Sequence, residues 1–161
     1  MTIEFTSIGT IHSPFTTLVG MPIQPSAADG IQGFIELNKK LESALMDLDG
    51  FSHLYLIYYF HLSKTFKLKV KPFLEDQPHG LFSTRAPNRP NQIGLSVVKL
   101  ISIKKNILYI ENVDIIDGTP LLDIKPYVKQ MEPTQNLRIG WLEKHTALVN
   151  SKKSDKRFIN N

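Results

Sequence analysis

The sequence predicts an all-β protein, a small β-barrel with one or two short helices. Several short segments alternate apolar and polar residues, which is the period of a strand with one buried face. The alternation of strands and helices that builds a parallel sheet is missing, and so is the glycine fingerprint G-x-G-x-x-G. The chain has 161 residues, which fits one domain of ordinary size.

Six segments and a short seventh have strand signals. Residues 54–60 form an aromatic and aliphatic run without polar interruption, so we expect a strand buried on both faces, as is common in closed barrels. Residues 93–103 and 107–113 are expected to form a hairpin. The other predicted strands are residues 5–11, 31–37, 66–70 and, as a short one, 80–83.

Helix signals occur in two places. Asn38 is expected to cap a helix that ends at Gly50, and a short terminal helix is expected within residues 140–150. No repeat or linker divides the chain. We therefore expect a barrel domain over residues 1–135, followed by a short C-terminal segment over residues 136–161.

The formal charge of +4 is concentrated at the C-terminal end. Residues 150–161 contain 4 basic and 1 acidic side chains, whereas the rest of the chain has 15 basic and 14 acidic side chains. This tail is expected to be mobile. It is either a solvated end or a loose electrostatic contact to RNA or DNA phosphates.

Several absences limit the function classes. The chain has no cysteine, which excludes a disulfide scaffold, a thiolate zinc site and a cysteine nucleophile. The 5 histidines show no close ligand spacing, so no metal site is predicted. The longest apolar run is far shorter than the ~20 residues that span a bilayer, and the N-terminus lacks a signal-peptide pattern. We expect a soluble, cytoplasmic protein with no membrane contact.

Residues 82–96, FSTRAPNRPNQIGLS, form a loop stiffened by two prolines. Arginine offers a planar fork of donors that suits carboxylates, phosphates and aromatic rings. Two interpretations remain open: a loop built to present polar groups, or a surface turn whose arginines cap carbonyl groups. The polar groups concerned are Arg85, Asn88, Arg89 and Asn91.

Residues 114–127, DIIDGTPLLDIKPY, interleave charged and aliphatic side chains. Asp117 and Gly118 are a common turn pair. The alternation around them predicts a partly buried loop whose carboxylates have partners, with Arg85 and Arg89 as candidates.

These two segments, together with IGTIHSP at residues 8–14 and FSHL at residues 51–54, resemble the TsaA-like family of tRNA adenosine methyltransferases. The shared signature is TR, two or three residues, RPNxIG, and then DGTPLLDIKPY. The resemblance implies a β-barrel methyltransferase of non-Rossmann type that uses S-adenosylmethionine. It also implies a homodimer with the cofactor near the subunit interface, and a tRNA partner methylated at N6 of threonylcarbamoyl-adenosine beside the anticodon.

The same resemblance implies a cofactor-binding set drawn from several loops. As our own hypothesis, Arg85 takes the carboxylate of the cofactor, Asp114 its ammonium group, and Leu62 or Leu95 its adenine ring. The implied cofactor-binding residues are Gln24, Pro25, His61, Leu62, Arg85, Leu95, Asn112, Val113 and Asp114.

The acceptor nitrogen has a delocalised lone pair, so a base should add to the rate obtained by alignment. Asp117 is the first candidate because it lies at the turn of the signature, and His61 and Tyr127 are the others. Each has a simpler alternative: a turn residue, a strand end and core packing, respectively. Asn91 or Lys125 would orient the substrate, and Arg89 and Asn88 would bind it.

Two positions depart from the family pattern. Gln92 stands where relatives have proline, which loosens the loop, and Ile23 stands where many carry arginine. Two other functions therefore remain open: a non-catalytic nucleic-acid-binding barrel, or a methyltransferase acting on a small molecule.

Overall fold

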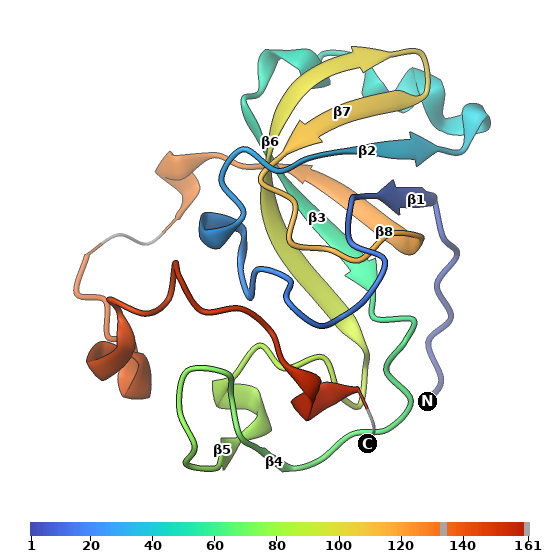
Figure 1. Ribbon diagram of the computed structural model, residues 1–161. Helices are drawn as coiled ribbons and strands as arrows, with labels where there is room; N and C mark the ends of the chain where they lie inside the picture. Colours follow the sequence, from blue (N-terminus) through green and yellow to red (C-terminus); the bar gives the residue numbers. More distant parts are fainter. Residues whose placement is uncertain (133–134, 160–161) are drawn as a thin grey trace.

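The computed structural model describes residues 1–132 and 135–159 and confirms the predicted barrel (Figure 1). Six antiparallel strands close in the order β1-β2-β7-β6-β3-β8. The hairpin of β6 and β7 is the one that the sequence predicts. The bounds are Gly9–His12 for β1, Gln32–Leu37 for β2, His53–Tyr59 for β3, Ile93–Lys104 for β6, Ile107–Glu111 for β7 and Thr119–Pro126 for β8.

Strand β3 has one buried face, so the prediction of burial on both faces is wrong. Leu54, Leu56 and Tyr58 are 0%, 0% and 6% exposed, whereas Tyr59 on the alternate face is 39% exposed. An unbroken apolar run does not show which residues face the barrel interior, because pairing with β6 and β8 decides that. The inward residues of all six strands form the main core.

Residues 114–127 were expected to form a loop, but most of them form β8. Thr119 and Leu121 are buried, and the strand pairs with both β1 and β3. The predicted turn at Asp117 and Gly118 is confirmed, with Gly118 at a φ of 76°. The charged residues in this strand point outward. The alternation of charged and aliphatic residues, which was interpreted as a loop, is therefore the two-residue period of a strand.

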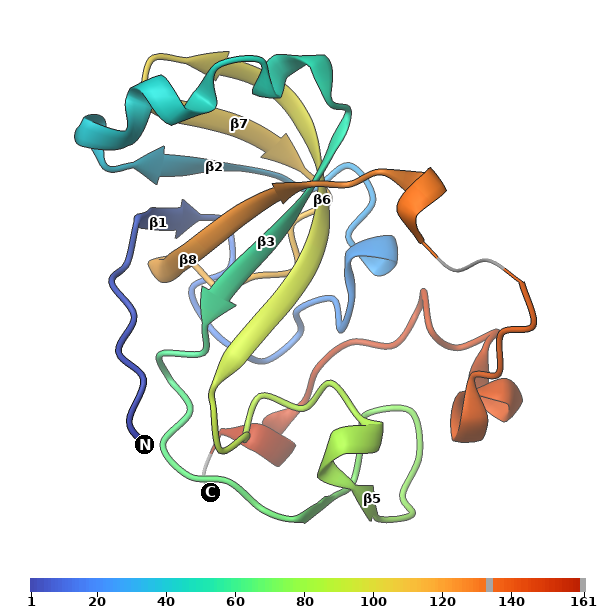
Figure 2. The same ribbon diagram turned by 180° about the vertical axis from the view of Figure 1, so that it is seen from behind.

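The predicted strands at 66–70 and 80–83 are mostly not strands. Only β4, Lys69–Val70, and β5, His79–Gly80, pair, and they form a separate two-stranded sheet outside the barrel. This sheet lies at the opposite end of the molecule from the 3₁₀ helix η2, Lys39–Leu45 (Figures 1 and 2). Val70 packs in a small second apolar cluster with Leu81 and Ala86.

The described helices are short 3₁₀ turns. Asn38 caps η2 as predicted, because its side chain accepts a hydrogen bond from the Lys40 backbone amide. No helix in residues 1–132 and 135–159 is long and apolar enough to cross a membrane. The other helices are η1, Pro25–Ala27; η3, Leu48–Gly50; η4, Leu81–Ser83; η5, Lys129–Met131; η6, Gly140–His145; and η7, Lys156–Phe158.

The C-terminal tail packs against the molecule up to residue 159, contrary to the expectation of a mobile end. The Ser154 backbone amide donates to Met21 O at 2.9 Å, and its carbonyl accepts from Gly20 N at 2.9 Å. Phe158 contacts the edge of the Phe73 ring, with centroids 5.0 Å apart. The expectation failed because the partners of Phe158 are distant in sequence. The division of the chain at residue 135 stays a prediction.

Candidate functional site

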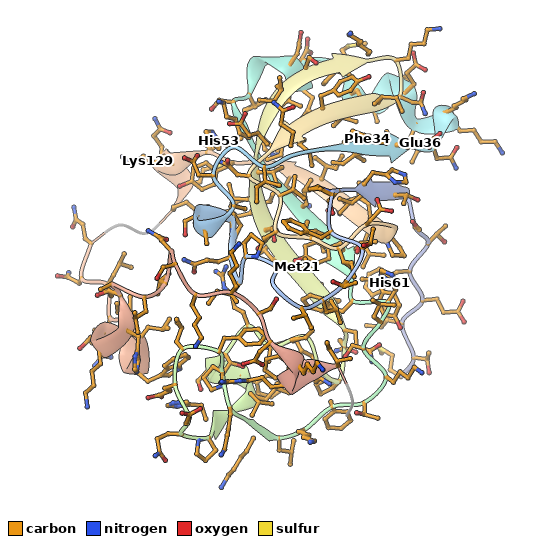
Figure 3. All side chains as sticks on the ribbon, viewed as in Figure 1. Met21, Phe34, Glu36, His53, His61 and Lys129 are labelled. Atoms are coloured by element: carbon orange, nitrogen blue, oxygen red, sulfur yellow. The ribbon has the colours of Figure 1, made fainter. Side chains whose placement is uncertain are left out.

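A cavity of about 340 Å³ opens where four segments of the chain meet. These segments are the loop before β2, the 84–89 loop, the first half of β6 and the C-terminal tail. Met21 is one of the lining residues and lies in Figure 3 below Phe34 and Glu36, which are labelled on β2. Five members of the predicted cofactor set line this cavity: Gln24, Pro25, Arg85, Leu95 and Asp114.

A smaller chamber of about 110 Å³ adjoins this cavity. Both are bounded by Tyr58 and Asp114, and the smaller one is also lined by His61 and Leu62. The His61 Nδ1 atom is buried and has no hydrogen-bond partner among the described residues. A buried polar atom left unpaired costs free energy, so this nitrogen is available to a ligand that enters the chamber.

Asp114 is held by a chain of hydrogen bonds from β6 and β3. Ser96 Oγ donates to Asp114 Oδ1 at 2.7 Å, and Tyr58 OH lies 3.1 Å from Ser96 Oγ. Burial raises the pKa of Asp114 from 3.8 to about 6, and the Ser96 hydrogen bond and the charge of Arg85 oppose the rise. A cationic ligand group in the cavity would favour the ionised carboxylate.

Gly94 permits this arrangement. A Cβ atom at position 94 would collide with the ring of Tyr58, which crosses β6 at that point. Gly94 and Tyr58 are opposite each other in the β3–β6 register. The glycine of the RPNxIG signature therefore gives space to an aromatic wall of the cavity.

The two arginines of the 84–89 loop have different environments. Arg89 Nη1 donates to Thr84 O at 2.9 Å, and its guanidinium lies 5.7 Å from the centroid of the Phe82 ring. Arg85 is exposed and lines both the 340 Å³ cavity and an outer groove of about 550 Å³ that is bounded by Trp141. Carbonyl capping therefore describes Arg89, whereas Arg85 is presented to a ligand.

Asp117 lies at the turn before β8 and binds the end of β1. Its Oδ1 accepts from Ser13 N at 3.1 Å and lies 3.1 Å from His12 Nδ1. These contacts are those of a residue that stabilises the turn, which is the simpler alternative for Asp117. Asp117 is not among the described residues that line the two cavities.

The other predicted catalytic and substrate-orienting residues also lie elsewhere. Lys125 pairs with Asp123 at 2.8 Å on the outside of β8, and Tyr127 packs on Tyr55 with ring centroids 5.4 Å apart. Asn91 is exposed two residues before β6, where its carbonyl accepts from Ile93 N. The structure does not bring these side chains together with His61.

Asn112 and Val113 do not line the cavity but hold the backbone that leads to Asp114. Asn112 has a φ of 68°, and its side chain accepts from Gly30 N at 3.1 Å. Val113 is 0% exposed in the barrel core.

Asn88 is 2% exposed, and its buried Oδ1 has no hydrogen-bond partner among the described residues.

Sequence analysis missed several cavity residues. Tyr58 and Ser96 come from strand interiors, and Asp155 and Phe158 come from the tail. The available signal was the pair of apolar residues Phe158 and Ile159 within an otherwise polar tail. Within residues 1–132 and 135–159, no group of three or more metal-binding side chains could hold a metal ion.

The closed antiparallel barrel and its mostly apolar cavity, which is lined by the TR and RPNxIG loop and has a few convergent polar groups, define a β-barrel protein with a small-molecule site. Residues 10–133 match the family described as the tRNA-methyltransferase O N-terminal domain. The chain belongs to this family.

Similar proteins agree with this assignment. A probable S-adenosyl-L-methionine-binding protein of Pyrococcus abyssi is 51% identical over 152 residues, covering 94% of this chain and 83% of that protein. A mouse tRNA (adenine(37)-N6)-methyltransferase is 39% identical, covering 82% of this chain but only 32% of the mouse protein. The crystal structure of TrmO from Pseudomonas aeruginosa superposes with a TM-score of 0.74 at 36% identity, covering 88% of this chain and 63% of that one.

Proposed function

We propose that this protein is an S-adenosylmethionine-dependent methyltransferase that methylates the N6 nitrogen of threonylcarbamoyl-adenosine beside the anticodon of tRNA. The observation that carries the proposal is the cavity, where Gln24, Arg85 and Asp114 converge from three distant parts of the chain. Its volume of about 340 Å³ lies within the usual range for small-ligand sites. The names of the mouse and Pseudomonas relatives support the reaction and the substrate.

The donor set of the cavity fits this cofactor. Arg85 offers a bidentate guanidinium to the carboxylate, and Asp114 offers a carboxylate to the ammonium group. Leu95 and Leu62 are 47% and 48% exposed and provide apolar surface for the adenine ring. The cofactor supplies an electrophilic methyl group, and the residues of the cavity align it with the acceptor nitrogen.

The chain must also accept the proton of the acceptor nitrogen. Among the predicted bases, His61 is favoured by its place in the chamber and its unpartnered Nδ1. Asp117 remains a second proposal, since its carboxylate already binds Ser13 and His12. Substrate positioning by Arg89, Asn91 or Lys125 is likewise proposed, because these side chains are partly or fully exposed and tRNA can approach them from outside the cavity. Asn88 is proposed too, but it is 2% exposed and would act only through its unpaired Oδ1 atom beside a groove that it lines.

The proposal includes a homodimer that acts in the cytoplasm. Tyr59, Ile93 and Leu95 are 39%, 37% and 47% exposed beside the cavity, on the outer face of β3 and β6. A second subunit that covered this face would bury these apolar side chains and enclose the cofactor. Light scattering of the purified protein should give twice the monomer mass, and the monomer mass would contradict this part of the proposal.

Arg85→Ala is expected to weaken S-adenosylmethionine binding by about ten- to a hundredfold, because a charge-assisted hydrogen bond contributes about 1.5–3 kcal/mol. Isothermal titration measures the change directly. Arg138→Ala removes an exposed arginine and is the matched control, with unchanged affinity expected. Equal affinities for the wild type and Arg85→Ala would contradict the placement of the carboxylate.

The reaction itself is tested with modified and unmodified tRNA. The protein is incubated with S-adenosylmethionine and each tRNA, and the digested nucleosides are analysed by mass spectrometry. We expect a methylated threonylcarbamoyl-adenosine only with the modified tRNA. Cofactor binding without tRNA methylation would favour a small-molecule acceptor, and no cofactor binding would favour a non-catalytic nucleic-acid-binding barrel.

A further inference from the structure

Residues 64–71, KTFKLKVK, form a basic segment that the proposed chemistry does not use. Lys64, Lys67, Lys69 and Lys71 are all exposed, and no acidic residue occurs between Asp49 and Glu75. Residues 1–149 have 15 basic and 14 acidic side chains, so this concentration is a local feature. We call residues 64–71 the lysine segment.

The lysine segment lines a groove of about 330 Å³. Val70 is 6% exposed and faces inward, which turns its neighbours Lys69 and Lys71 to the same outer side. Asn88 and Arg157 complete the groove, and no carboxylate is among the described residues that line it. A groove with cations and no lining carboxylate fits an anionic partner.

Nearby acidic groups leave Lys69 and Lys71 available. Asp155 and Asp76 pair with Arg157, at 2.9 Å and 3.6 Å, and Glu75 contacts His79 and His145. In the described part of the chain, neither Lys69 nor Lys71 is within ion-pair distance of these carboxylates. Lys69 and Lys71 therefore contribute most of the uncompensated positive charge along this side of the groove.

Exposed apolar side chains, two of them aromatic, accompany these charges. Phe66 and Leu68 are 51% and 72% exposed between the lysines, and Phe82 is 78% exposed beneath the guanidinium of Arg89. Proteins that bind single-stranded nucleic acid combine a cationic groove for the backbone with aromatic surfaces for bases. This combination favours an RNA strand over a free anion or an acidic protein.

The groove is also close to the candidate site. Phe158 lines this groove, the 340 Å³ cavity and the 550 Å³ outer groove, so the three adjoin. Lys69 and Val70 of β4 line the same groove as Arg157 and Phe158 of the tail. A strand bound along residues 64–71 can therefore extend to the cavity mouth.

We propose that the lysine segment binds the phosphodiester backbone of the tRNA anticodon loop and leads its target base to the 340 Å³ cavity. This inference rests on the proposed function, and it names the surface by which the substrate docks. In this proposal the lysine segment, and not the C-terminal tail, makes the main phosphate contacts, because the described part of the tail packs against the molecule.

The test compares two double variants with equal charge change. Lys69→Ala/Lys71→Ala changes the groove, and Lys39→Ala/Lys40→Ala removes two exposed lysines at η2, at the other end of the molecule. The dissociation constant for tRNA is measured between about 50 and 200 mM salt. We expect the groove variant to bind roughly tenfold more weakly and to lower the log–log salt slope by about 1.4–1.8, since each phosphate contact contributes about 0.7–0.9. The η2 variant should match the wild type.

Further measurements separate the possible failures. S-adenosylmethionine affinity should be the same in all three proteins, and Lys69→Arg/Lys71→Arg should restore tRNA binding because it keeps both charges. An unchanged salt slope in the groove variant, or an equal loss in the η2 variant, would overturn the inference while leaving the proposed function intact. If the wild type binds the cofactor but no tRNA, both the proposed substrate and this inference are wrong.

Discussion

Asp114→Asn is expected to make the cofactor-free protein more stable and to prevent cofactor binding. Burial raises the pKa of Asp114 from 3.8 to about 6, so the folded protein holds an ionised, desolvated carboxylate at neutral pH. Asparagine has no charge to desolvate and can still accept the hydrogen bond from Ser96. The expected gain at pH 7 is about 2–3 kcal/mol, or roughly 5–10 °C in the midpoint of thermal unfolding.

The pH dependence follows from the same pKa. Between the unfolded pKa of 3.8 and the folded pKa of about 6, the folded protein binds more protons than the unfolded chain. The stability contributed by Asp114 is therefore fully present below pH 3.8 and is lost as the pH rises through 6. Asp114→Asn should abolish this component, whereas cofactor binding by the wild type should strengthen as the pH rises through the same range.

Asp29→Asn removes an exposed carboxylate and is the control, with neither stability nor cofactor affinity expected to change. Thermal unfolding at several pH values, with and without S-adenosylmethionine, gives both quantities. A destabilised Asp114→Asn protein, or one that binds the cofactor normally, would show that this carboxylate has another function.

Gly94→Ala is expected to lower the free energy of unfolding by about 3 kcal/mol. The added Cβ would overlap the ring of Tyr58, which is 6% exposed and packed between the core and the cavity. Tyr58 must then turn, which breaks its contact with Ser96 and disturbs the wall at Asp114. Cofactor affinity should therefore fall together with stability.

Gly80→Ala provides the matched substitution for chemical denaturation. A Cβ at Gly80 meets no atom within 4 Å, so the stability of that variant should be close to that of the wild type. If Gly94→Ala is as stable as Gly80→Ala, the close packing of Tyr58 on β6 is not a requirement of the fold.

The sequence predicted the barrel strands more accurately than the roles of the site residues. The strand signals placed β2, β6 and β7 close to their observed bounds, but they did not show that Ser96 faces inward and that Ile93 and Leu95 face outward. They were wrong for β8, where Asp123 and Lys125 point outward within a strand that was read as a loop. Pairing with β1 and β3 determines that strand, and pairing partners are distant in sequence.

The 82–96 and 114–127 segments named the right region of the site but not the role of each residue. Arg85 and Arg89 are equivalent in the sequence, yet only Arg89 is held by the carbonyls of its own loop. Asp114 and Asp117 are likewise similar, but Asp114 enters the cavity and Asp117 binds the end of β1. These distinctions depend on the atoms that surround each charge.

By itself, the sequence determined the all-β class, the family resemblance and the absence of thiol chemistry, because these depend on local periodicity, motifs and composition. Only the tertiary structure decided how the +4 charge is distributed in space. The described tail folds back to form part of the cavity wall, and the lysine segment forms a groove next to it. The reason is physical: a charge acts through its distance to other groups and its exposure to water, and closure of the barrel sets both.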